Sequence, residues 1–341
     1  MDRAIPMVLT EGALSSSEPG RAESLALAEN LARGGGDAEH VLQAARIFAL
    51  EGQRDRAVET LRKGILAEPR HVGLLSLLAD LLSRAGSFEE ADRYFAQSLE
   101  QLPSDAETRH RQGLHFARQG RWTEARDAYE ESVRLEPSSV RGWVNLGLTR
   151  ADLGDRFGAI AALERAVRVD PLCGEAHSNL GVLYYEGGMR AEAIAQFRRA
   201  VEIAPDSSES HFNLGWALLA EDDLDQSEAM LEASVRLDPA NVESLYALAL
   251  LHLRVGKYAR AVTDLKQALE HRPDDARLHY HLGDAYNRQD AVDQAILALE
   301  TAARLNPDDA RAHRLLGVAY DKKELPTRAR EAYRRAAALN G

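Results

Sequence analysis

Apolar and small residues recur along the chain at a fixed interval of 34 positions. A column of alanines runs from Ala57 to Ala329, with Ser227 as its one exception. A column of large apolar residues comprises Leu61, Phe95, Tyr129, Leu163, Phe197, Leu231, Leu265, Leu299 and Tyr333. Columns of small residues let two helices approach closely, and the column of large residues fills the space between the helices. Each interval therefore predicts two amphipathic helices of about 13 residues, each about 20 Å long.

Glycine and proline mark the ends of the predicted helices. Glycines such as Gly120 and Gly154 end the first helix of a pair. Prolines follow the second helix at the same interval, at Pro69, Pro103, Pro137, Pro171, Pro205, Pro239, Pro273 and Pro307. Two helix starts carry side chains with capping-box spacing, Ser104 with Glu107 and Asp206 with Glu209. One helix pair cannot bury its apolar face alone, so stacked neighbours must share one continuous core.

The stretch WVNLGLTRADLGDRFGAIAALERAVRVDP, residues 143–171, resembles the tetratricopeptide repeat. That family's pattern is a large residue, Leu-Gly, Tyr, Ala, Phe, Ala and Pro, and about nine repeats between Ala38 and Gly341 follow it. The resemblance implies an all-α, right-handed superhelical α-solenoid of tandem helix-turn-helix repeats. The chain departs from the pattern at Arg109 and Arg150, and we expect a perturbed first helix in the fourth repeat.

Three segments are predicted along the chain. Residues 1–18 are expected to be disordered, and residues 19–37 to form a capping helix followed by a Gly-rich break. A degenerate half-repeat is the alternative to the capping helix. Residues 38–341 are predicted to form the tetratricopeptide solenoid, with repeats starting near residues 38, 72, 106, 140, 174, 208, 242, 276 and 310.

Composition narrows the class of protein. The net charge of −12 argues against a nucleic-acid binder, whose binding surface is basic. No apolar run approaches the roughly 18 residues of a membrane span, so no membrane insertion is expected. Cys173 is the only cysteine, which excludes an intrachain disulfide and is consistent with a reducing compartment. The first residues lack the pattern of a signal peptide, and we expect a cytoplasmic protein.

Four histidines share one column and raise the question of a metal site, at His177, His211, His279 and His313. Trp143 and Leu245 occupy the same column, which indicates a packing position between paired helices. The histidines also lie a whole repeat apart, too far to share one ion with bonds of about 2 Å. We therefore predict no metal and no cofactor. No phosphate-binding loop, nucleophile elbow or Cys–His pairing occurs, and no catalytic residue is predicted.

Asparagines form another column, at Asn145, Asn179 and Asn213. In the tetratricopeptide family, notably in the repeat region of O-GlcNAc transferase, asparagines at this position line the concave face and hold an extended peptide by its backbone. An amide side chain offers both a donor and an acceptor, which matches a peptide group. The resemblance therefore implies a peptide-binding role for these three residues. The alternative is that they are common residues of the motif and face water.

Aromatic and basic side chains are predicted on the same inner face. The aromatic set comprises Tyr185, Phe212, Trp216, Tyr246 and Tyr280, and an apolar strip of this kind marks an interaction site. Burial by curvature or self-association is the alternative. Near the C-terminus the inner columns become basic, at Arg277, Arg311 and Arg314. In an acidic chain this predicts an acidic segment on the partner.

These patterns predict a non-enzymatic protein–protein interaction scaffold or adaptor. It would bind an extended peptide or a partner domain in the concave groove of the repeats, with a protein or peptide as its partner and no nucleic acid. The chain is expected to be a monomer or a weak oligomer. One alternative is a substrate-recruiting subunit of a glycosyltransferase-like enzyme whose catalytic domain is elsewhere. The other is a self-assembling structural protein.

Overall fold

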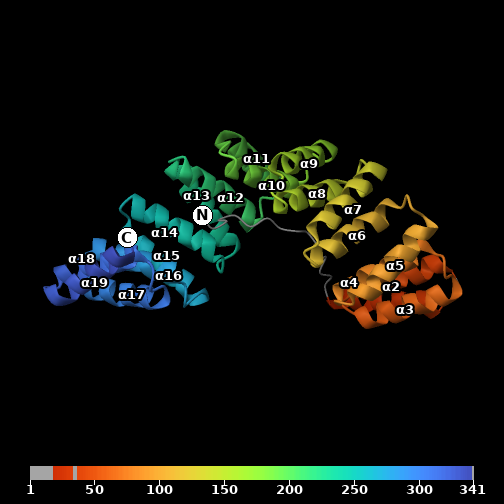
Figure 1. Cartoon of the computed structure of the whole chain (residues 1–341), viewed down its shortest axis with the longest axis horizontal. Helices are drawn as coiled ribbons and strands as arrows, with labels where there is room; N and C mark the ends of the chain where they lie inside the picture. Colours follow the sequence, from red (N-terminus) through yellow and green to blue (C-terminus); the bar gives the residue numbers. More distant parts are fainter. Residues whose placement is uncertain (1–17, 34–36, 340–341) are drawn as a thin grey trace. The chain divides into compact units, whose positions relative to one another are not determined.

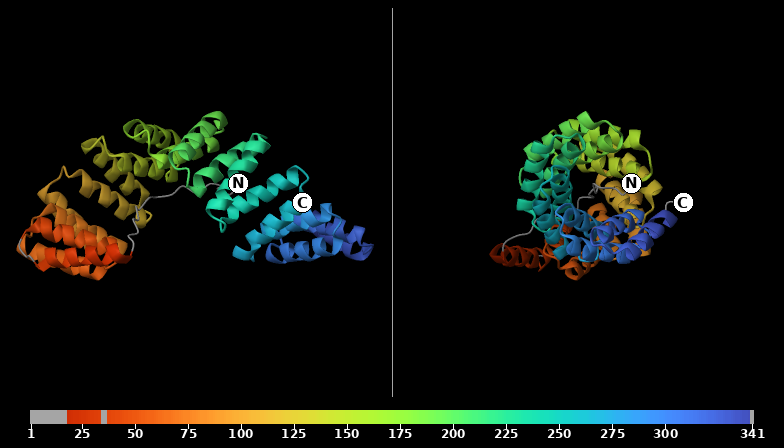
Figure 2. Two further views of the ribbon diagram at one scale, coloured as in Figure 1. Left: turned by 180° about the vertical axis from the view of Figure 1, so that it is seen from behind. Right: turned by 90° about the vertical axis from the view of Figure 1, so that its left-hand side faces the viewer.

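The structure, a computed structural model, describes residues 18–33 and 37–339 and contains 19 α-helices and no β-strand within them (Figure 1). These helices are grouped in two compact units, and the boundary between the units falls after Leu183, inside α10. Within each unit, successive helix pairs pack against one another (Figure 2). The predicted all-α fold of tandem helix-turn-helix repeats is confirmed.

Apart from α1 (Glu18–Arg33), first helices of 13 residues alternate with second helices of 14 residues. The first helices are α2 (Ala38–Leu50), α4 (Val72–Arg84), α6 (Ala106–Arg118), α8 (Val140–Asp152), α10 (Gly174–Glu186), α12 (Ser208–Ala220), α14 (Val242–Arg254), α16 (Ala276–Arg288) and α18 (Ala310–Lys322). The second helices are α3 (Arg54–Ala67), α5 (Phe88–Gln101), α7 (Trp122–Leu135), α9 (Arg156–Val169), α11 (Arg190–Ile203), α13 (Leu224–Leu237), α15 (Tyr258–His271), α17 (Val292–Leu305) and α19 (Pro326–Leu339).

The predicted helix caps lie one residue too early in the sequence. The side chain of Asp105, and not of Ser104, accepts the backbone N–H of Thr108 at 2.9 Å and begins α6. In the same way Ser207, and not Asp206, caps α12. The residues after the proline form the corner of a turn, which a backbone hydrogen bond from Asp105 N–H to the carbonyl of Leu102 closes. The cap is therefore the residue that closes that turn.

The turn between the two helices of a repeat needs one residue in the left-handed backbone region. Glycine occupies it in six repeats, for example at Gly120 with φ of 70°. The other three turns have a residue with a Cβ atom in this conformation, which is sterically less favourable than glycine. They are Asp222, Asp290 and Glu324, with φ between 58° and 65°. These three turns therefore hold some backbone strain.

The first helix of the fourth repeat is regular, which corrects the expectation of a perturbed helix. Helix α8 has the same 13 residues as the other first helices. The unusual Arg150 near its end donates to the carbonyl of Gly158 at 3.1 Å and to Glu130 at 2.9 Å. A long side chain that reaches two acceptors replaces the usual aromatic here without distorting the backbone.

Close approach of paired helices explains the glycine column in the first helices. A Cβ atom added at Gly283 would lie 2.4 Å from Cγ of Leu299, and one at Gly113 would lie 2.5 Å from the ring of Tyr129. The large side chain of the second helix thus packs directly on the glycine of the first. Tyr129 and Leu299 are fully buried as a result.

Helix α1 packs against α2 at the start of the first unit. Ala28 of α1 is fully buried and shares a core cluster with Leu42, Phe48 and Leu61. The capping role of this helix stays a prediction. The segments predicted as disordered and as a Gly-rich break fall largely on residues 1–17 and 34–36, which lie outside the described residues.

Candidate functional site

First helices of successive repeats contact one another within each unit. In the first unit α4 contacts both α2 and α6, and in the second unit α12, α14, α16 and α18 are in contact one after another. We call the surface that these helices form within one unit the first-helix layer of that unit. All of the predicted peptide-binding residues lie on first helices.

One contact recurs between neighbouring first helices and joins side chains 35 residues apart. It pairs the sixth residue of a first helix with the fifth residue of the preceding one. The pairs are Asn145 Nδ2 with His110 Nε2 at 3.4 Å, His281 Nε2 with Tyr246 Oη at 3.1 Å, and Arg111 Nη1 with Ser76 Oγ at 3.0 Å. The sixth position, which the asparagine column occupies, therefore lies between neighbouring helices of the layer.

All three asparagines of the predicted ladder are buried, and Asn213 has no exposed surface. Both amide atoms of Asn213 and the Nδ2 of Asn179 lack a hydrogen-bond partner within the described part of the chain. Asn145 and Asn179 lie in the first unit and Asn213 in the second. Sequence spacing correctly places the column on first helices, but all three side chains are removed from solvent there. Its binding role stays a prediction.

The predicted aromatic residues differ in how far they reach solvent. Phe212 is 4% exposed, and its ring centroid lies 6.1 Å from that of Trp216, which is partly exposed. The guanidinium of Arg277 covers the ring of Tyr246 at 5.3 Å, and the guanidinium of Arg311 covers the ring of Tyr280 in the same way. Tyr185 has Arg190 over its ring at 5.7 Å. Within the described part of the chain, Trp216 is thus the aromatic residue of this set that is neither buried nor covered by an arginine.

The predicted basic residues are largely held by the chain's own carboxylates. Arg277 donates two hydrogen bonds to Asp275, at 3.2 Å and 2.9 Å, and also lies 3.5 Å from Glu243. Arg311 makes the equivalent pair with Asp309 at 3.0 Å. Burial acts to raise the pKa of Asp275, but the hydrogen bonds and the charge of Arg277 outweigh burial and the pKa lies below its usual value.

These ion pairs weaken the basis for an acidic partner at the C-terminal repeats. Asp275 and Asp309 cap their own helices, so each carboxylate holds its arginine beside the helix start. Arg314, the third predicted basic residue, is exposed on α18. The acidic partner at this end stays a prediction.

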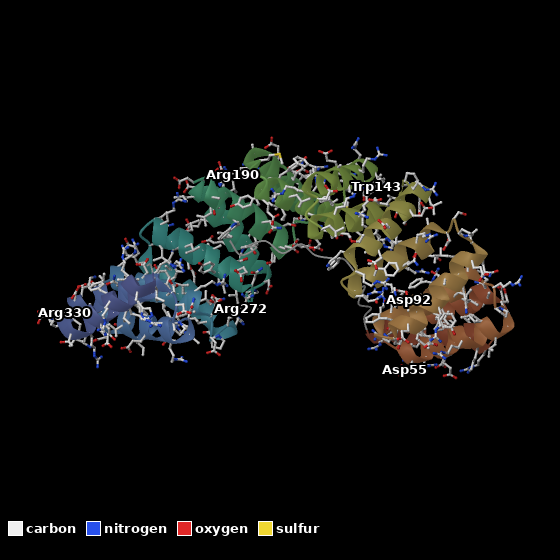
Figure 3. The ribbon with its side chains drawn as sticks, viewed as in Figure 1. Asp55, Asp92, Trp143, Arg190, Arg272 and Arg330 are labelled. Carbon is white, nitrogen blue, oxygen red and sulfur yellow. The ribbon has the colours of Figure 1, made fainter. Side chains whose placement is uncertain are left out.

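The column that contains four histidines has a structural role. Trp143, labelled in Figure 3, donates its Nε1–H to the carbonyl of Pro137 at 2.9 Å. His177, His279 and His313 reach the carbonyl of the proline six residues earlier in the same way, at 3.2 Å, 2.8 Å and 2.9 Å. A carbonyl accepts only from an N–H, so these histidines carry a proton on Nε2. Within residues 18–33 and 37–339 no three metal-ligating side chains gather.

A pocket of about 640 Å³ opens on the first-helix layer of the first unit. Five arginines line it, Arg46, Arg54, Arg84, Arg111 and Arg141, together with Asp80, Glu107, Glu175 and several leucines. The sequence pattern does not reveal this pocket, because its arginines occupy five different columns of the repeat. Only the packing of helices α2, α3, α4, α6 and α8 brings them together.

A buried histidine also lines this pocket. His110 is 5% exposed, and burial lowers its pKa to about 4, so the ring is neutral near pH 7. Its Nε2 faces the amide of Asn145, and its ring packs against that of Tyr129 with the centroids 5.5 Å apart. The buried Nδ1 has no partner among the described residues. His110 therefore contributes polarity to the pocket wall without charge.

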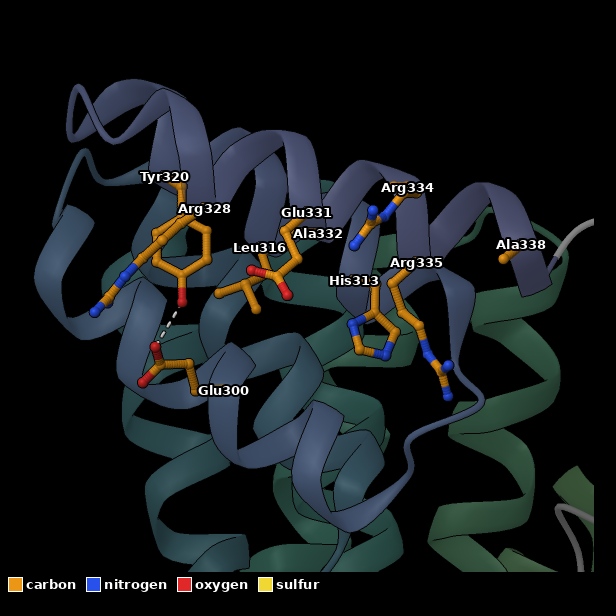
Figure 4. A pocket seen from close by; sticks show the side chains of 10 residues that line it. All are labelled: Glu300, His313, Leu316, Tyr320, Arg328, Glu331, Ala332, Arg334, Arg335 and Ala338. Carbon is orange, nitrogen blue, oxygen red and sulfur yellow. Dashed lines mark hydrogen bonds between the residues drawn. The ribbon is translucent and has the colours of Figure 1, made fainter.

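A second pocket of about 750 Å³ lies between α17, α18 and α19 (Figure 4). The Tyr320 hydroxyl donates to Glu300 at 2.6 Å across it, and the Arg328 guanidinium lies 5.8 Å from the centre of the Tyr320 ring. Burial and the hydrogen bond to Glu300 raise the pKa of Tyr320 to about 12. The Tyr320 hydroxyl and Glu300 thus satisfy one another within the wall of this pocket.

Comparison with known families decides the identity of the repeats. Residues 138–341, more than half of the chain, match the model of the cilia and flagella-associated protein 70 C-terminal domain. The chain belongs to this family. Residues 76–140 and 110–155 also match the general tetratricopeptide-repeat model. This member of the cilia and flagella-associated protein 70 C-terminal domain family is therefore a tetratricopeptide-repeat scaffold, and a specific similarity to O-GlcNAc transferase stays a prediction.

Two solved structures with TM-scores above 0.5 share the fold at low sequence identity. The Cut9–Hcn1 hetero-tetramer of the APC/C is 17% identical, with a TM-score of 0.56, over 90% of this chain and 60% of that chain. PilF of Pseudomonas aeruginosa is 18% identical, with a TM-score of 0.55, over 66% of this chain and 96% of that chain. MamA of Desulfovibrio magneticus RS-1 is 22% identical over 49% of this chain and 94% of that chain, with a TM-score of 0.47. A search of curated proteins found no match.

None of the helices in the described residues has both the length and the apolar character needed to cross a bilayer.

Proposed function

We propose that this chain is a non-enzymatic protein-interaction scaffold that holds an extended segment of a partner protein on its first-helix layer. The observation that carries the proposal is the position of Trp216. Its ring is partly exposed on α12 and rests beside the buried Phe212. A large aromatic side chain that is anchored on one side and open on the other is the kind of residue that dominates binding energy at protein interfaces.

Neighbouring positions extend this surface within the second unit. Leu250 occupies the position of Trp216 in the next repeat and is also partly exposed. Tyr246 lies on the same helix as Leu250, with its ring covered by Arg277. An extended peptide that crosses α12 and α14 would therefore meet two apolar side chains and then a guanidinium edge. This arrangement favours a partner segment in which apolar residues are followed by a hydrogen-bond acceptor, either a backbone carbonyl or an acidic side chain, that reaches the guanidinium.

The unsatisfied amides support a role for the asparagine column. A buried amide without a partner costs about 1 to 3 kcal/mol, so a ligand group that reaches it gains from satisfying it. Asn213 has two such atoms and Asn179 has one. Asn145 already faces His110 and should contribute least. Asn213 has no exposed surface that a partner could reach, whereas Asn179 keeps 4% exposure, so we rank Asn179 first among the three as a contact to the backbone of a partner.

The experiment is affinity capture on the immobilised chain, identification of the bound protein by mass spectrometry, and calorimetric titration with that protein. Trp216→Ala should weaken binding by about 2 kcal/mol, which is about thirtyfold. Trp143→Ala is the matched control, because this tryptophan also lies on a first helix but is engaged with Pro137 and Arg165.

The control variant should bind the partner as the wild type does. Circular dichroism must show that both variants keep their helix content. Equal affinity of Trp216→Ala and wild type in folded protein would show that the partner binds elsewhere. A loss of equal size in both variants would point to a general effect on the array and would equally contradict the proposal.

A further inference from the structure

The arginine-lined pocket of the first unit carries more positive than negative side chains. Five arginines and three carboxylates line it, in a chain whose net charge is −12. Asp80 is 5% exposed and lies between two cations, with Arg84 Nε at 3.1 Å and Arg118 Nη1 at 3.0 Å. Its charge is therefore compensated inside the protein. A ligand in the pocket would meet a positive surface.

Two of the arginines have no acidic partner. Among the described residues, Arg46 and Arg54 make no ion pair and no side-chain hydrogen bond, and both are exposed at the pocket. Arg141 lies 3.7 Å from Glu107 and its side chain is 73% exposed. Each guanidinium presents a planar set of donors that fits a carboxylate with two parallel hydrogen bonds. These three side chains remain available to a ligand.

Other arginines are held in place before any ligand arrives. Arg111 donates to Ser76 Oγ at 3.0 Å and pairs with Glu107 at 2.8 Å, and its side chain is mostly buried. Arg84 is fixed by Asp80. Side chains that are already ordered lose little entropy when a ligand binds. Binding here is therefore opposed by a smaller loss of side-chain entropy than on a mobile surface.

Apolar side chains lie beside these charges. Leu77 and Leu81 of α4 are buried and line the pocket together with Leu114 of α6. Leu50 at the end of α2 is 66% exposed. The pocket thus offers apolar contact between cationic groups. A ligand with carboxylates and at least one apolar side chain matches both features.

We propose that this pocket binds a carboxylate-rich segment of a partner protein, with Arg46, Arg54 and Arg141 pairing with its acidic side chains and the leucines contacting an apolar residue between them. The inference rests on the proposed scaffold function and adds the chemistry of the partner. It also moves the acidic partner predicted from the sequence away from Arg277 and Arg311, which the chain's own aspartates hold.

A protein segment fits this pocket better than a nucleic acid does. Glu107 is 43% exposed between Arg111 and Arg141, and Glu175 also lines the pocket. A continuous phosphate backbone would approach these carboxylates, whereas a peptide places its acidic side chains at separate points. Leucines also give no favourable contact to phosphates. Nucleic acid is therefore an outcome of the test and not the proposal.

The test uses the full chain and a short dye-labelled peptide made of Gly-Glu-Leu-Glu repeats, with fluorescence anisotropy in low-salt buffer. A peptide with glutamine in place of every glutamate is the control ligand. The wild type should bind the glutamate peptide at least tenfold more tightly. The double variant Arg46→Gln, Arg54→Gln should bind it about tenfold more weakly than the wild type, as expected for two partly exposed charge pairs.

A matched control removes the same charge from second helices of the same unit. Arg134→Gln with Arg168→Gln changes two exposed arginines of α7 and α9, and this variant should bind as the wild type does. Equal binding of the two peptides, or wild-type affinity in the Arg46, Arg54 variant, would overturn the inference. A single-stranded oligonucleotide that binds as tightly as the glutamate peptide would also overturn it.

Failure here and failure of the proposed function give different results. If the natural partner binds in a Trp216-dependent way while the glutamate peptide shows no preference, only the acidic-segment inference falls. If the glutamate peptide binds through Arg46 and Arg54 but partner binding is independent of Trp216, the first unit is the interaction site and the Trp216 surface is not.

Discussion

The buried His110 should make the first unit sensitive to mild acid. Burial lowers its pKa to about 4, against an ordinary value of 6.5, because the interior does not solvate the imidazolium. Nearby charges act in both directions, with Glu107 raising the pKa and Arg141 lowering it. Protonation would also place an N–H on Nε2 opposite the amide Nδ2 of Asn145, two donors face to face.

The sign and size of the effect follow from proton linkage. Between the two pKa values the unfolded chain binds a proton at this histidine and the folded chain does not, so stability falls as the pH falls. The loss begins near pH 6.5 and continues down to about pH 4. From pH 7 to pH 5, this one histidine should lower the free energy of unfolding by about 2 kcal/mol.

The measurement compares the pH dependence of unfolding in the wild type and in His110→Gln, which does not titrate in this range. Urea unfolding followed by circular dichroism at pH 7 and pH 5 gives the change for each protein. Between pH 7 and pH 5, the free energy of unfolding should fall by about 2 kcal/mol less in His110→Gln than in the wild type.

The exposed His40 provides the control for removal of an imidazole, as His40→Gln. Imidazole resonances in the NMR spectrum report the pKa of His110 directly. The same pH dependence in His110→Gln and wild type, or an NMR pKa near 6.5, would show that burial of His110 does not set the acid sensitivity. Because repeat arrays do not always unfold in one step, both transitions must be fitted in the same way.

Three further predictions concern the repeat itself, and denaturant unfolding tests each of them. Gly283→Ala should lower stability by about 1 kcal/mol, because the clash with Leu299 outweighs the better helix propensity of alanine; a stabilised variant would contradict the packing. Glu324→Gly should raise stability by up to about 1 kcal/mol by relieving its positive φ, whereas Gly120→Ala at the equivalent turn should lower it by about 1 kcal/mol; shifts of the same sign would contradict this. His279→Ala should cost about 1 kcal/mol through the lost bond to the preceding proline carbonyl, and His279→Trp should retain that bond, as Trp143 does; equal losses would exclude the bond as the cause.

The sequence alone was sufficient for the helices, their pairing and the core. The predicted large column is fully buried from Leu61 to Leu299, whereas its last member, Tyr333, is 36% exposed. This succeeds because each repeat contacts mainly its neighbours, so the 34-residue pattern records almost every core contact. The turn at Gly120 is equally local, since one residue must adopt a left-handed conformation there. The caps were misplaced by one residue because the preceding turn also uses Ser and Asp.

The binding surface was decided by the tertiary structure. Column membership places Asn213 on a first helix, but it does not show that the amide of Asn213 is buried. Column membership also does not show that Asp275 holds Arg277, because that contact depends on the conformations of the two side chains. Arg46 and Arg54 share no column with the other pocket arginines, and stacking alone brings them to one pocket. Helices follow from short-range periodicity, whereas a surface depends on distances between side chains of different repeats that a periodic pattern does not encode.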